Sequence, residues 1–149
     1  MNTYKDKPVE DPQIMIMAIG DAYSDSAPLQ ATQFESDIRI AEQLSEIYFE
    51  GRGGGNGGES HLAAWYFAAR HTSIDSYNLH GRKGYLFTIG DEPNHKYLTR
   101  EQIKEFFGDD VPDDLSATEL LEEVSKKYNV YHICVGRYAY YGSDTKWRS

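Results

Sequence analysis

The chain has 149 residues, and 24 Asp and Glu against 15 Lys and Arg give it a formal charge of −9. This acidity argues against nucleic acid or an anionic membrane as the main partner, because phosphate groups are bound by basic surfaces. The single cysteine, Cys134, excludes an internal disulfide and a cysteine-based zinc site, and we expect a reducing, cytoplasmic compartment. The longest apolar run, residues 14–19, is too short to predict a membrane span.

The first half of the chain begins with a polar segment, residues 1–12, that we predict to be an N-terminal arm. The apolar run at 13–19 predicts a strand buried on both faces, and it ends in Gly20-Asp21. We expect residues 21–33 to form a loop. Apolar residues at helical spacing within 34–49 predict an amphipathic helix in part of that stretch.

Six glycines within residues 51–58 lead into an alanine-rich segment, 59–72, which predicts a helix. Glycines at a helix start can cradle a phosphate through backbone N–H groups. However, the Lys-Ser/Thr pair of a P-loop is absent, and Glu59 would repel phosphate. A tightly turned loop is the structural alternative. Two histidines of this region, His61 and His71, are ten residues apart and are expected on opposite sides of the helix, which argues against a shared ligand role.

Two further strands and two capped helices follow. Residues 84–89 and 130–135 predict short apolar strands, and a polar, aromatic tail occupies 137–149. A capping box predicts a helix at 100–107, and a second box predicts one from 116 to about 128. The boxes pair these residues: Thr99 with Gln102, and Ser116 with Glu119.

Short apolar strands that alternate with helices predict an α/β fold with a parallel sheet. Ligands of such sheets bind beyond the C-terminal strand ends, where Gly20-Asp21 and Gly90-Asp91 are expected to lie. A carboxylate directly after a buried strand, followed here by Glu92, suits a hard divalent cation. The structural alternative is that Asp91 caps its own turn.

Three segments in this order resemble the von Willebrand factor type A (VWA) family: AIGDAYSD at 18–25, GGGNGGES at 53–60 and IGDEPNH at 89–95. The resemblance covers a domain of residues 13–136. It implies a Rossmann-like parallel sheet with helices on both faces. It also implies a divalent cation at the C-terminal edge of the sheet, which family members use to hold an acidic side chain of a protein partner.

The resemblance assigns Asp91 to the cation, which we expect to be Mg²⁺. The middle ligand position falls on Asn56 when the motif is aligned from the glycines, and on Glu59 when it is aligned back from the alanines at 63–64. Residues expected beside this site or against the partner are Asp21, Glu92, His95 and Ser60.

The Asp-x-Ser-x-Ser motif of the family does not occur in the chain. The nearest match, DAYSDS at 21–26, has Tyr23 and Asp25 where the serines belong, and it follows the wrong strand. We therefore expect an incomplete VWA-like domain that lacks the first, central strand of the family order. The missing strand would come from a protein partner, from a second copy in a homo-oligomer, or from the N-terminal arm.

The resulting hypothesis is a VWA-like protein-interaction module that is not an enzyme and binds neither nucleic acid nor membrane. One alternative is a metal-dependent hydrolase or phosphotransfer enzyme that uses Asp21, Asp91 and Glu92 around magnesium. Another is a metal-free structural subunit completed by a partner chain. An enzyme also needs a nucleophile or general base, and the sequence offers no convincing one.

Overall fold

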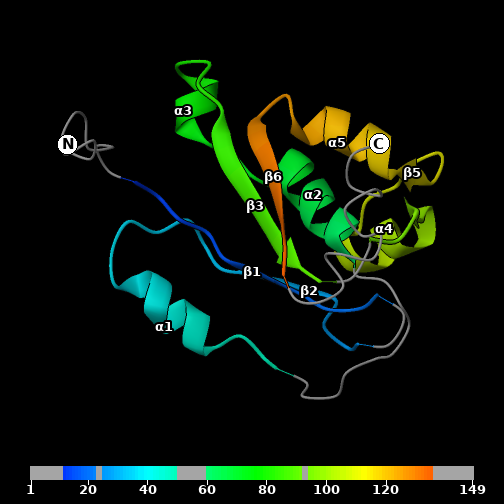
Figure 1. The fold of residues 1–149 in the computed structure, drawn as a ribbon, viewed down its shortest axis with the longest axis horizontal. Helices are drawn as coiled ribbons and strands as arrows, with labels where there is room; N and C mark the ends of the chain where they lie inside the picture. The colour runs from blue at the N-terminus through cyan, green and yellow to red at the C-terminus, as the bar shows by residue number, and fades with distance from the viewer. Residues whose placement is uncertain (1–11, 23–24, 50–59, 92–93, 136–149) are drawn as a thin grey trace.

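The computed structural model describes residues 12–22, 25–49, 60–91 and 94–135 (Figure 1). The predicted arm up to residue 11, the glycine loop at 51–58 and the tail at 137–149 lie outside the described residues. In chain order the elements are β1 (Met17–Ile19), β2 (Leu29–Ala31), α1 (Arg39–Ser45), α2 (His61–Arg70), α3 (Asp75–Asn78), β3 (Gly84–Gly90), β4 (Tyr97–Leu98), α4 (Arg100–Phe107), β5 (Leu115–Ser116), α5 (Ala117–Val124) and β6 (Tyr128–Cys134).

The parallel pair β3–β6 is the longest piece of sheet in the described part of the chain. It runs in register from Gly84 opposite Tyr128 to Gly90 opposite Cys134. Alternate side chains of β3 are buried, among them Leu86 and Thr88. The buried face lies against α2 and α5, which Figure 1 shows on the same side of the pair. The sequence-based prediction of parallel strands holds for these two strands, and the fold is mixed α/β.

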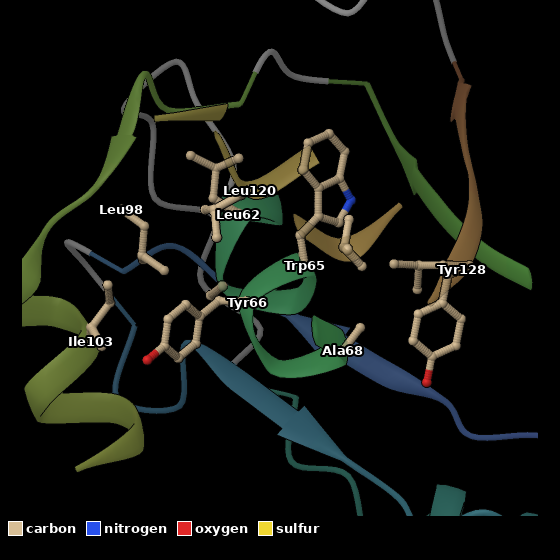
Figure 2. Close-up of a cluster of buried hydrophobic side chains, with 11 residues drawn as sticks. Leu62, Trp65, Tyr66, Ala68, Leu98, Ile103, Leu120 and Tyr128 are labelled. Carbon is tan, nitrogen blue, oxygen red and sulfur yellow. The ribbon is translucent and has the colours of Figure 1, made fainter. Parts of the chain in front are cut away.

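Helix α2 lies at the centre of the core. Its alanines let neighbouring elements approach closely, and its large side chains fill the space between them. Figure 2 shows Leu62, Trp65 and Tyr66 of α2 among side chains from the other elements. Leu120 of α5 and Ile103 of α4 are both fully buried in the same cluster. The core therefore joins the parallel pair to α4 and α5 through one helix.

Both predicted capping boxes are present. The backbone N–H of Gln102 donates to the Thr99 side chain, and the Gln102 side chain accepts from the Thr99 backbone. Ser116 and Glu119 cap α5 in the same reciprocal way. Helix α4 has the predicted bounds and is followed by the cap residue Gly108, whose φ of 76° favours glycine. Helix α5 ends at Val124, earlier than predicted, because the chain turns there to enter β6.

The N-terminal segment differs from the prediction. Strand β1 is three residues long and half-buried, and it pairs antiparallel with β2, with Met17 opposite Ala31. The prediction of a loop over 21–33 is wrong at β2, because a three-residue strand carries no periodic signal of its own and depends on its hairpin partner. Helix α1 lies within the predicted stretch, but none of its residues is buried.

Within the described residues the strands form three separate two-stranded sheets: β1–β2, β3–β6 and β4–β5. Both β1 and the parallel pair contact α2, although no ladder of hydrogen bonds joins them in the part of the chain described. The predicted single sheet with helices on both faces is therefore present only in part, as a small parallel pair with helices on one face. Among the described helices, none has the length and apolar character needed to cross a membrane.

Candidate functional site

Polar side chains from five parts of the chain meet near the C-terminal ends of β1 and β3. The set, called the histidine cluster below, consists of Asp21, Ser60, His61, Thr88, His95 and His132. The rings of His61 and His132 meet edge to face with centroids 5.2 Å apart. His95 Nε2 lies 3.5 Å from Asp21 Oδ1. These residues lie at the edge of an α/β sheet where ligands usually bind.

Local structure places each member of the cluster. The β3–β6 register puts Thr88 opposite His132, and Thr88 Oγ1 lies 3.0 Å from His132 Nδ1. Ser60 caps the turn after β1, because its Oγ accepts a hydrogen bond of 2.9 Å from the backbone N–H of Ala22. This bond ties the N-terminal end of α2 to the loop that holds Asp21. His61, the first residue of α2, is thereby held over the end of β3.

Burial sets the charge of the two central histidines. His61 is only 2% exposed, and burial lowers its pKa to about 4, with repulsion from His132 and His95 acting in the same direction. Burial also lowers the pKa of His132. Both imidazoles are therefore neutral at pH 7, and each then offers one hydrogen-bond donor and one acceptor. A general base must reach its substrate, so the burial of His61 does not suit it to that role.

Of the residues predicted for the site, the structure brings three together. Asp21, Ser60 and His95 belong to the histidine cluster, whereas Asp91 is exposed just beyond β3. Asn56, Glu59 and Glu92 lie outside the described residues. No group of three His, Cys, Asp or Glu side chains that could hold a metal ion occurs in ranges 12–22, 25–49, 60–91 and 94–135. Binding of Mg²⁺ by Asp91 with Asn56 or Glu59 stays a prediction.

Sequence reasoning missed His61 and His132 as members of the site. His71 lies just after the other end of α2, where its Nε2 is 2.7 Å from Asp109 Oδ2, so the length of the helix, rather than its opposite sides, separates it from His61. The informative signal was the position of His61 at a helix start that follows a glycine run. For His132, the signal was its two-residue spacing from Val130, which places both side chains on one face of the strand.

Gly90 makes room for the histidine cluster. A Cβ added at this position would lie 2.8 Å from the His61 ring, a rigid and buried group. We expect Gly90→Ala to lower the free energy of unfolding by about 1 to 3 kcal/mol through overpacking. Urea denaturation would measure the loss. Gly81→Ala is not a clean control, because Gly81 has a φ of 65°, so Leu79→Ala, a change to alanine at a residue 71% exposed, serves as the control.

A second feature is the outward face of the parallel pair, called the open face below. It consists of Tyr85, Phe87, Ile89, Tyr131, Ile133 and Val135, all of them exposed. The rings of Phe87 and Tyr131 stack with centroids 5.3 Å apart and an angle of 18° between their planes. Tyr85 stacks on both of them at 6.4 and 6.5 Å. The open face is thus a continuous row of aromatic and aliphatic side chains.

Comparison of the chain with protein-family models, with curated proteins and with solved structures finds no match.

Proposed function

We propose that the chain is a protein-interaction module of the VWA-like class and that it binds a protein through the open face. The observation that carries this proposal is the exposure of the face in a parallel pair. Parallel strands in α/β proteins are normally covered on both faces. Here the described helices cover one face only, while Phe87 at the centre of the other face is 56% exposed.

The size of the open face supports the proposal. Three half-exposed aromatic side chains and three aliphatic ones present roughly 600 Å² of apolar surface, taking 150 to 250 Å² for a whole aromatic side chain. The largest apolar patch of a typical monomer spans about 300 to 600 Å², and patches of that size are often functional. The open face is therefore at the upper end of this range and is a reasonable protein-binding surface.

The finer part of the proposal is that a strand from the partner completes a VWA-like sheet. It is supported by the separation of β1–β2 from β3–β6 within the described residues, although both pairs contact α2. Strand edges without a ladder partner can accept an added strand through backbone hydrogen bonds. The cation expected from the family resemblance is a separate prediction, and no step of this proposal depends on it.

Affinity capture tests the proposed function. Tagged wild-type chain should retain a protein from an extract of the source cells, and Phe87→Lys/Tyr131→Lys should lose at least about nine tenths of it, since a buried lysine opposes binding. The matched control is Leu79→Lys, because Leu79 is an apolar residue 71% exposed outside the open face. Equal retention by the wild type and by the double variant would contradict the proposal.

A further inference from the structure

The open face has an outward surface without charge. The side chains that β3 directs outward are Tyr85, Phe87 and Ile89, and β6 adds Tyr131 and Ile133 before Val135. Asn129, the remaining polar residue of this row, donates its amide N–H to the carbonyl of Gly84 at 3.3 Å. An incoming surface therefore meets apolar groups across the six residues of the open face, and ionisable residues come only at its ends, with Lys83 two residues before Tyr85 and Asp91 two residues after Ile89.

This neutrality matters for a chain of formal charge −9. Two acidic copies repel each other wherever their charged surfaces meet, and like charges placed directly opposite in an interface are costly. A face without charge lets two copies approach closely. The uncharged side chains of this face also do not attract the charged surface of a different protein.

The area of the open face matches what a dimer requires. If each copy contributes its roughly 600 Å² of apolar surface, the interface buries about 1,200 Å², which is the lower end of the range for specific complexes. Flat sheet faces pack well on one another, with about 10 Å between the sheets. The stacking of Tyr85, Phe87 and Tyr131 joins their rings into one continuous surface that a second sheet can contact.

We infer that the occupant of the open face is a second copy of this chain, in a symmetric dimer whose two sheets pack face to face. This inference rests on the proposed function and names the partner of the same surface. In a two-fold interface each residue near the axis meets its own counterpart. Phe87 lies between Tyr85 and Ile89 on its strand and beside Tyr131 on the next, so the axis passes near Phe87.

Sedimentation equilibrium of the purified chain tests the dimer. The wild type should approach twice its 17.0 kDa as its concentration rises through the micromolar range. We expect Phe87→Lys to raise the dimer dissociation constant at least about tenfold, because it places two like charges in an apolar interface. Leu79→Lys, the matched control outside the open face, should sediment as the wild type does. Circular dichroism would show that each variant is folded.

A cysteine variant tests the same geometry without adding charge. Phe87→Cys in a Cys134→Ser background should be joined into a covalent dimer by a short bifunctional thiol crosslinker, which spans the gap of about 10 Å between packed sheets that a direct disulfide does not reach. Leu79→Cys in that background should not be joined. A folded wild type that stays monomeric at every concentration would overturn the inference, as would a dimer that Phe87→Lys leaves unchanged. If the chain is monomeric and extract capture still depends on the open face, the proposed function stands with a different protein as partner. If neither dimerisation nor capture from the extract depends on the open face, the inferred dimer and the proposed function are both wrong.

Discussion

Acidification from pH 7 to about pH 4.5 is expected to lower the free energy of unfolding by roughly 2 to 3 kcal/mol through His61 alone. The folded-state pKa of His61 is about 4, below the ordinary value of 6.5, chiefly because the ring is buried. Between these two values the unfolded chain binds a proton that the folded chain does not. Stability is therefore present above pH 6.5 and is lost as the pH falls towards 4. The lowered pKa of His132 acts in the same direction.

Urea denaturation at several pH values between 4.5 and 7 would measure this loss. His61→Gln removes the titrating ring, so we expect a flatter dependence of stability on pH, whatever its effect on stability at pH 7. His80→Gln is the matched control, because His80 lies exposed in the turn after α3. An unchanged slope in His61→Gln would show that the buried ring does not govern acid sensitivity.

Between pH 4.5 and 7, the loss of stability caused by His61 is separated from the loss caused by the carboxylates. Hydrogen bonds from Tyr66 and His71 hold the pKa of Asp109 below its ordinary range, and those from Arg70 do the same for Glu123. Groups with a lowered carboxyl pKa lose their stabilising effect as the pH falls through that lowered value. Their contribution is therefore lost mainly below the window in which His61 acts.

Replacement of Leu120 by alanine is expected to lower the free energy of unfolding by about 2 to 5 kcal/mol, which is the usual cost of a large cavity in a core. Leu120 is fully buried and projects from α5 into the cluster around α2 (Figure 2). Urea denaturation monitored by circular dichroism would measure the effect. Leu79→Ala, at an exposed leucine, should change stability by no more than about 0.5 kcal/mol.

The stability of Leu120→Ala also tests whether α2 and α5 support the open face from its buried side. Helices α2 and α5 support the buried side of the parallel pair, so loss of their packing should loosen the strands that carry Phe87 and Tyr131. A loss of less than about 1 kcal/mol in Leu120→Ala would mean that α5 does not pack on α2 as described. In that case the open face would have no rigid support.

Local sequence determined the two capped helices, α4 and α5, whereas it did not predict the short helix α3. The boxes at Thr99 and Ser116 act within four residues, so the start of α4 and of α5 could be predicted without knowledge of the fold. The alanine-rich segment likewise determined α2, and two short apolar runs determined β3 and β6. In the proposed site, the sequence singled out Asp21, Ser60 and His95, which do lie together, although the role predicted for them stays untested.

Only the tertiary structure decided the antiparallel pairing of β1 with β2, the joining of His61 with His132 and the exposure of the open face. The pairing depends on the neighbouring strand of a hairpin, and the other two depend on segments that are far apart in the chain. A hairpin strand of three residues has no periodicity of its own, and the pKa of His61 falls to about 4 chiefly because other elements bury its ring. Apolar runs such as Gly84–Gly90 predict a strand, but they do not show whether one face or both faces are covered. That depends on which elements pack against the strand, a matter of distant contacts rather than of local pattern.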